Sequence, residues 1–236
     1  MHRLQIAPLG AAALFLALAS TAAANGLSVS AAAALGPASS QWGLRIDLVD
    51  APGQRNPAWV VAGPAEGFSD ETTLAGTFFV DPQNVTMSTT PGVNSFQMID
   101  FLDGVGPGGR VWLIFHLNRT AGGYFINVWH WNRNLSGGSG GFQFSGGNFL
   151  ALANNANWHN NRVDFEWTAG DPGHLTLWRT RYLGGEPDAS GTIEMFSVDL
   201  PGMQDATINY VFAGMFTSHD PGTSGPLFLD EFSFHR

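Results

Sequence analysis

The stretch WHNNRVDFEWTAGDPGHLTLWRTRYL, residues 158–183, predicts two antiparallel strands joined by a tight turn. In each half, apolar side chains alternate with polar ones, the period of two expected of a strand with one buried face. The Asp-Pro-Gly segment at residues 171–173 has the composition of a turn. We therefore expect a β-hairpin with one face in a core. The residues on that face are Val163, Phe165, Trp167, Leu175, Leu177 and Arg179.

The chain outside this hairpin repeats the same pattern of short alternating runs separated by clusters of Gly, Asn, Asp and Pro. Such runs are typical of an all-β protein, and helical periodicity is nearly absent after the N-terminal segment. About a dozen strands are predicted, and a single flat sheet of that size normally curls or splits into two packed sheets. The predicted fold is an all-β, two-sheet antiparallel jelly-roll sandwich.

The N-terminal segment has the features of a secretory signal peptide. A weakly basic start precedes an apolar run from Leu9 to Ala19, and small residues at Ala22 and Ala24 fit a cleavage site. The run is too short for a membrane-spanning helix of about 20 residues, so we expect no membrane insertion. We predict a signal peptide at 1–24, a flexible spacer at 25–40 and one β-sandwich domain at 41–236. The expected location is secreted or periplasmic.

The charge balance narrows the choice of partners. The chain has 19 Asp and Glu against 10 Arg, no Lys and no Cys, so disulfides cannot contribute to its stability. Removal of the predicted signal peptide takes away one arginine and leaves a net charge of about −10. Binding of nucleic acid requires clustered basic residues, which this sequence lacks. The expected partner is instead a glycan or another cell-surface polymer, and the oligomeric state is not defined by the sequence.

Four segments carry a resemblance to a known group of proteins. They read GTFFVDP at 76–82, NWHNNRVDFEW at 157–167, GHLTLW at 173–178 and GPLFLDEFSF at 225–234. In their order and spacing they resemble the concanavalin A-like lectin/glucanase superfamily, which includes laminin G-like domains and small exported bacterial sandwich proteins. The resemblance implies a concanavalin A-like fold and an interaction with carbohydrate.

Two carboxylates, Asp164 and Glu166, are the candidates for catalysis. They lie two residues apart on one predicted strand and so point to the same face. Retaining glycosidases place two carboxyl groups about 5–5.5 Å apart. The resembling glucanases carry an E-x-D-x-E pattern, and Arg162 stands where the resemblance would place the nucleophile. We therefore expect a solvated strand face, in which Arg162 pairs with its acidic neighbours, and keep catalysis as an alternative.

Aromatic residues near the centre of the chain are the candidates for glycan binding, because sugar faces stack on indole rings while polar groups hold the hydroxyls. Asn127, Trp129, Trp131 and Arg133 share one face of a predicted strand. If the other face is core, this set forms a polar and aromatic surface, whereas if both faces are buried the tryptophans only contribute to packing. Trp178 is a secondary candidate on the polar face of its own strand.

A buried carboxylate in the last predicted strand raises the question of a metal. Asp230 alternates with phenylalanines, and a carboxylate in such surroundings needs a partner. A structural calcium is one such partner, with Asp100 and Asp103 as helpers. The histidine spacing does not fit a zinc site, and we expect no other cofactor.

The sequence therefore favours an exported, non-catalytic domain that binds a polysaccharide or cell-surface glycan. One alternative is a glycoside hydrolase or polysaccharide lyase of the glucanase-like fold, and another is a structural or interaction domain without a small ligand. An exposed sheet face lined by tryptophan and polar groups would favour binding. Free carboxylates opposite Arg or Tyr in a groove would favour hydrolysis.

Overall fold

The computed structural model describes most of the predicted domain. The described residues are 4–5, 26–35, 43–50, 58–105, 109–136, 140–145, 150–154, 159–183, 186–190, 193–215 and 219–235. The predicted signal peptide lies outside them except for the two residues of β1. No helix long and apolar enough to span a bilayer occurs in these ranges.

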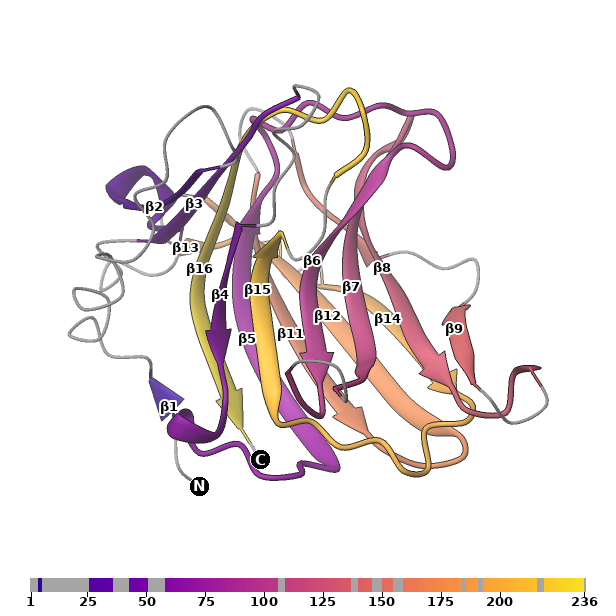
Figure 1. The fold of residues 1–236 in the computed structure, drawn as a ribbon. Helices are drawn as coiled ribbons and strands as arrows, with labels where there is room; N and C mark the ends of the chain where they lie inside the picture. Colours follow the sequence, from indigo (N-terminus) through magenta and orange to yellow (C-terminus); the bar gives the residue numbers. More distant parts are fainter. Residues whose placement is uncertain are drawn as a thin grey trace.

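The structure is a sandwich of two antiparallel sheets, which lie one behind the other in Figure 1, so the predicted all-β jelly-roll sandwich is confirmed. Sheet A is nine-stranded and follows the order β13-β12-β11-β5-β16-β3-β2, with β14 also pairing with β12 and β1 with β16. Its strands are β1 (Leu4–Gln5), β2 (Gly26–Ser30), β3 (Gly43–Leu48), β5 (Thr73–Asp81), β11 (Asn160–Thr168), β12 (Gly173–Leu183), β13 (Glu186–Pro187), β14 (Ile193–Leu200) and β16 (Gly225–His235).

Sheet B is seven-stranded and follows the order β10-β8-β7-β6-β15-β4, with β9 also pairing with β8. Its strands are β4 (Ala58–Ala62), β6 (Ser95–Leu102), β7 (Val111–Thr120), β8 (Gly123–Asn132), β9 (Gly141–Phe144), β10 (Leu150–Ala151) and β15 (Tyr210–Met215). The consecutive strands β15 and β16 belong to different sheets, so the end of the chain crosses from one layer to the other (Figure 1). Two short 3-10 helices, η2 (Ala31–Ala33) and η3 (Pro64–Glu66), complete the regular elements among the described residues.

The predicted hairpin is formed by β11 and β12, which pair antiparallel from Asn160–Tyr182 to Thr168–His174. Its predicted inner face is confirmed, because all six of its residues are buried. Arg179 is included in that face, and its guanidinium reaches Glu194 on β14 at 3.2 Å. The alternation in the sequence therefore correctly predicts which side of the hairpin faces the core.

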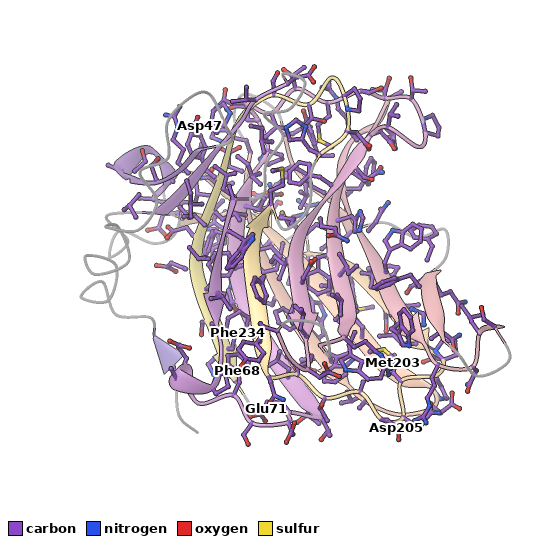
Figure 2. The ribbon with its side chains drawn as sticks, in the orientation of Figure 1. Asp47, Phe68, Glu71, Met203, Asp205 and Phe234 are labelled. Atoms are coloured by element: carbon purple, nitrogen blue, oxygen red, sulfur yellow. The ribbon has the colours of Figure 1, made fainter. Side chains whose placement is uncertain are left out.

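Aromatic side chains from both sheets interlock in the core. Phe165 of sheet A contacts Phe101 and Phe115 of sheet B edge to face, with ring centroids 5.5 and 5.6 Å apart. Such contacts add about 0.5–1.5 kcal/mol each to the burial of the rings. At one end of the sandwich Phe68 packs against Phe234, with ring centroids 5.7 Å apart (Figure 2). The core thus holds the two sheets in a fixed relation and defines an outer face for each.

Residues 26–35, which lie within the predicted spacer at 25–40, include a strand and a short helix. Strand β2 pairs along β3, and η2 follows it. Ala33 and Leu35 pack with Phe79, Tyr182 and Phe228 in a small second cluster of buried residues on sheet A. Apolar burial of these small residues, which composition alone does not reveal, fixes the segment.

The last strand departs from the predicted alternation. A bulge between Asp230 and Ser233 shifts the register of β16 against β5, and Glu231 has a φ of 47°. A bulge adds one residue and reverses which side chains point inward. Phe232 and Phe234 therefore join the main core, whereas Asp230 does not share their face, which corrects the expected placement.

Candidate functional site

The two sheets each present an outer face, on the side away from the shared core. On sheet A this face is formed by the residues of β11 and β12 that alternate with the buried ones. On sheet B it is formed by the corresponding residues of β6, β7 and β8. The candidate residues from the sequence are divided between these two faces.

The outer face of sheet A carries the carboxylates that were candidates for catalysis. Arg162 donates from Nε and Nη2 to Oδ1 of Asp164, at 3.1 and 2.8 Å. The Thr77 hydroxyl donates to the same oxygen at 2.5 Å. The expected pairing of Arg162 with Asp164 is therefore present. It occupies the Asp164 carboxylate, which would have to be free of such bonds to act as a nucleophile.

Sheet A also has a shallow hollow of about 230 Å³ beside these groups. Asp164, Glu166 and Trp178 all line it. Nearby, His174 lies 3.0 Å from Asp199 and 3.0 Å from the Ser197 hydroxyl, at an exposed edge of the sheet. The polar groups of this face are thus largely bonded to one another.

The outer face of sheet B contains a row of polar side chains on three adjacent strands. His116 of β7 is directly opposite Gln97 of β6 and Asn127 of β8. Directly opposed residues place their Cβ atoms about 4.5–5.5 Å apart. Asp100 of β6 lies one position further along the same face, opposite Ile114. Four hydrogen-bonding side chains are thus gathered on one small area.

Each of these side chains has at least one buried polar atom without a hydrogen-bond partner among the described residues. Asp100 is 0% exposed and Asn127 is 6% exposed. Within the described part of the chain, both carboxylate oxygens of Asp100 and the side-chain oxygens of Gln97 and Asn127 make no hydrogen bond, and the same holds for Nδ1 of His116. Each buried polar atom without a partner costs about 1–3 kcal/mol. Because so many such atoms lie on neighbouring strands, this row is the candidate site.

Burial also sets the protonation of this cluster. It raises the pKa of Asp100 to about 8, because the ionised carboxylate loses its hydration. The same cause lowers the pKa of His116 to about 4. Both groups are therefore neutral near pH 7, the imidazole as a base and the carboxyl as an acid. Shifts of this size in opposite directions are typical of functional sites.

Aromatic rings surround the polar row. Trp129 lies against His116 with ring centroids 5.8 Å apart and against Phe144 of β9 at 5.3 Å. Trp131 contacts Phe142 edge to face at 5.3 Å. The opposite side of β8 is core, because Ile126, Val128 and His130 are all buried, which is the first of the two arrangements that the sequence left open. The structure therefore places Asn127, Trp129 and Trp131 together on the outer face of sheet B, with both indoles partly exposed.

Two other residues predicted to bind glycan do not join this set. Trp178 lies on sheet A, opposite Asp164 and Met195, and therefore on the other side of the sandwich. Arg133 follows the end of β8 and forms an ion pair with Asp205, which Figure 2 labels near one end of the molecule. A strand pattern tells which residues share a face, but not which sheet that face belongs to.

The three carboxylates considered for calcium do not converge. Asp230 accepts hydrogen bonds from the backbone N–H of Leu35 at 2.8 Å and of Glu231 at 2.8 Å. Asp100 lies on the other sheet, and Oδ2 of Asp103 accepts from the indole of Trp112 at 3.0 Å. Among the described residues no group of three or more His, Asp or Glu side chains is arranged to hold a metal ion. The structural calcium thus has no ligand set in these residues.

The sequence reading missed most of the polar row. Gln97 was not considered, His116 was considered only for zinc, and Asp100 was considered only for calcium. One signal was available in the sequence, since His116 stands in the strongly apolar run WLIFHL at 112–117, and a polar residue in such a run needs a partner. The pairing of β6 with β7 and of β7 with β8, which collects these residues, is a tertiary feature.

Comparison with known proteins defines no family, because no family model and no curated protein matches the chain. Among solved structures, alginate lyase Aly36B is 13% identical, with 82% of this chain and 80% of that one covered and a TM-score of 0.46. The alginate lyase from Klebsiella pneumoniae is 16% identical, with coverages of 84% and 73% and a TM-score of 0.40. The CBM2 module of the evolved Dit of Lactobacillus casei BL23 phage J-1 is 12% identical, with coverages of 91% and 79% and a TM-score of 0.38. Each TM-score is below 0.5, so these likenesses decide neither the family nor the activity of this chain.

Proposed function

We propose that the outer face of sheet B binds an acidic polysaccharide and that His116 promotes its cleavage by β-elimination. The observation that carries the proposal is the group of buried, unpartnered polar atoms on Gln97, Asp100, His116 and Asn127. We further propose that the protein is exported, which would bring it to such a polymer.

Binding rests on the combination of indole rings and amides. Trp129 and Trp131 offer surfaces on which sugar rings stack. The amide groups of Gln97 and Asn127 flank His116 on both sides and can accept hydrogen bonds from hydroxyl groups or donate them to a carboxylate. A uronate carries both kinds of group. A neutral Asp100 adds no negative charge that would repel it.

The proposed elimination depends on the neutral imidazole of His116, which lies between the amides of Gln97 and Asn127. Hydrogen bonds from the amides to the uronate carboxylate stabilise the charge that develops when the proton next to that carboxylate leaves. His116 takes this proton from C5, the bond between C4 and the glycosidic oxygen breaks, and a C4–C5 double bond forms. The imidazolium then returns the proton to the departing oxygen, so no other reactant is needed.

Glycosidic hydrolysis at sheet A has weaker support. Its two carboxylates differ in their surroundings, since Asp164 is engaged by Arg162 and Thr77 while Glu166 is exposed. A retaining mechanism requires one carboxylate free to attack and the other protonated.

The test uses alginate as the first polymer, because one of the compared structures is an alginate lyase in complex with alginate tetrasaccharide. Cleavage by β-elimination is followed by the ultraviolet absorbance of the unsaturated uronate product. We expect His116→Gln to lower the rate by at least about 100-fold, the lower range for loss of a general base. The matched control is Glu166→Gln, an exposed residue of sheet A, which should leave the rate unchanged. A His116→Gln variant with the rate of the original protein would overturn the assignment.

The second candidate function is binding without cleavage. It is favoured by the aromatic contacts of Trp129, Trp131, Phe142 and Phe144, which line the face along β8 and β9. Retention of the protein on immobilised alginate, together with no absorbance change on prolonged incubation, would establish this candidate and exclude the lyase.

A further inference from the structure

An arginine lies between two tryptophans at one end of the outer face of sheet B. The guanidinium carbon of Arg110 is 4.9 Å from the ring centroid of Trp112 and 5.2 Å from that of Trp131. Arg110 is exposed and directly precedes β7, and Trp131 belongs to β8. A guanidinium stacked against indoles is pre-organised, while the N–H groups on its rim stay free to donate.

The nearest carboxylate holds this arrangement without neutralising it. Oδ1 of Asp103 accepts from the backbone N–H of Arg110 at 2.6 Å, and its Oδ2 accepts from the Trp112 indole at 3.0 Å. Both carboxylate oxygens of Asp103 are thus engaged in hydrogen bonds that hold the Arg110 backbone and the Trp112 ring in place. Among the described residues no acidic side chain forms an ion pair with the Arg110 guanidinium.

Trp131 is held from its other side by close backbone packing. A Cβ atom on Gly140 would lie 2.4 Å from Nε1 of Trp131, and Gly140 has a φ of 79°. Only glycine adopts such a φ freely and lets the backbone approach the ring so closely. The indole is therefore fixed between Gly140 and the guanidinium.

We propose that Arg110, stacked between Trp112 and Trp131, is a subsite that binds a carboxylate of the polymer away from the reacting sugar and makes the protein prefer acidic over neutral polysaccharides. This inference rests on the proposed function. Arg110 and His116 are six positions apart along β7, which corresponds to about 20 Å of extended strand. The subsite therefore contacts a different sugar unit from the one at His116.

The positive charge of Arg110 matters because the rest of the chain is acidic. The whole chain has a formal net charge of −9, so its general field repels an anionic polymer. A carboxylate facing the planar fork of Arg110 can form paired, charge-assisted hydrogen bonds. A neutral sugar gains little from the same group, and the difference produces the preference.

The test compares Arg110→Gln with Arg133→Gln, which removes the same charge from a residue near the end of β8 that is already paired with Asp205. Binding to alginate and to a neutral β-glucan is measured by titration at several salt concentrations. We expect Arg110→Gln to weaken alginate binding about tenfold, with a smaller salt dependence and unchanged binding to the glucan. Arg133→Gln should change alginate binding by less than about twofold.

Kinetics separate this subsite from the reacting groups. A distal binding group contributes equally to ground state and transition state, so Arg110→Gln should raise KM and leave kcat unchanged. Arg110→Lys, which keeps the charge but not the planar fork, should restore part of the preference. Gly140→Ala, which displaces the Trp131 ring, should weaken alginate binding although Arg110 is intact. Thermal unfolding confirms that the variants are folded.

Two outcomes overturn the inference in different ways. If Arg110→Gln keeps the preference for alginate while His116→Gln still loses the elimination activity, the subsite is wrong and the proposed function stands. If the original protein binds no polyuronate at all, both are wrong.

Discussion

The outer faces of the two sheets hold their polar side chains in opposite ways. On sheet A, Asp164 is satisfied by Arg162 and Thr77, and His174 by Asp199 and Ser197. On sheet B, Asp100 and single polar atoms of Gln97, His116 and Asn127 are buried without partners in the described part of the chain. A surface that satisfies its own polar groups gains little from a ligand, whereas one that leaves them unpaired lowers its free energy when a ligand supplies the bonds.

This difference changes which residues in the sequence are the best indicators of a functional site. Alternating charged residues in the RVDFEW segment attract attention as a catalytic pattern, yet Arg162 and Asp164 form an ion pair along the strand. Asp100 and His116, whose pKa values are shifted strongly by burial, are instead single polar residues within apolar strands. In this fold, burial rather than charge density marks the candidate site.

The difference between the two outer faces is tested most directly by measuring how the free energy of unfolding of an Asp100→Asn variant depends on pH. Burial raises the folded-state pKa of Asp100 to about 8 from its ordinary 3.8. Between these values the folded state keeps a proton that the unfolded state has lost, so its contribution to stability is complete below 3.8 and is lost as the pH rises through about 8. The variant lacks this loss, so relative to the difference between the two proteins below pH 3.8 it should gain on the order of 6 kcal/mol over the original protein by about pH 9.

Thermal and denaturant unfolding across this pH range measure the gain. His116 acts with the opposite sign, since its folded-state pKa is about 4 against an ordinary 6.5, and its contribution is lost as the pH falls through about 4. The Asp100 effect is therefore read most cleanly above the ordinary pKa of histidine. An Asp100→Asn variant with the same pH profile as the original protein would show that Asp100 is ionised in the fold and that the two faces do not differ as described.

The second prediction removes one polar group from each face. Asp164→Ala should destabilise the protein by about 1 kcal/mol, because a partly exposed ion pair contributes little and the Thr77 bond adds to it. Asn127→Leu should stabilise it by about 1 kcal/mol, because it removes a buried oxygen that has no partner. The same Asn127→Leu variant should lose affinity for alginate.

Denaturant midpoints with unchanged slopes measure both stability changes, and a titration with alginate measures the affinity. Glu166→Gln, on the exposed side of β11, serves as a control and should stay within about 0.5 kcal/mol of the original protein. Destabilisation by Asn127→Leu comparable to that by Asp164→Ala would mean that the two faces are alike and that the polar row is structural.

The sequence could predict the sandwich because alternation is a local property. The inner residues of β11 and β12 follow directly from the period of two, whereas the sequence shows which residues of β8 share a face but not whether one face or both are buried. The bulge at Glu231 could not be predicted in this way, because an inserted residue reverses the alternation without any change in composition. The folding of residues 26–35 onto sheet A depends likewise on a distant partner, Asp230.

For the same reason, only part of the candidate site could be predicted from the sequence. Asn127, Trp129 and Trp131 were found because they alternate on one strand. Gln97 and His116 are 19 residues apart in the chain, and the antiparallel pairing of β6 with β7 brings them together. Trp178, the secondary candidate on its own strand, lies on a different sheet from Trp129, which the alternation along a single strand cannot reveal.

The last prediction compares those two tryptophans. Trp129→Ala removes a stacking surface beside His116 and should weaken alginate binding about tenfold, about 1.4 kcal/mol. Trp178→Ala removes an indole of similar partial exposure from sheet A and should leave the affinity unchanged, although it exposes part of the hollow next to Asp164. Quenching of tryptophan fluorescence by added alginate provides an internal check, since Trp129→Ala should reduce the quenching and Trp178→Ala should not. If Trp178→Ala weakens binding while Trp129→Ala has no effect, the polymer binds at sheet A, and the unpartnered groups of sheet B require another explanation.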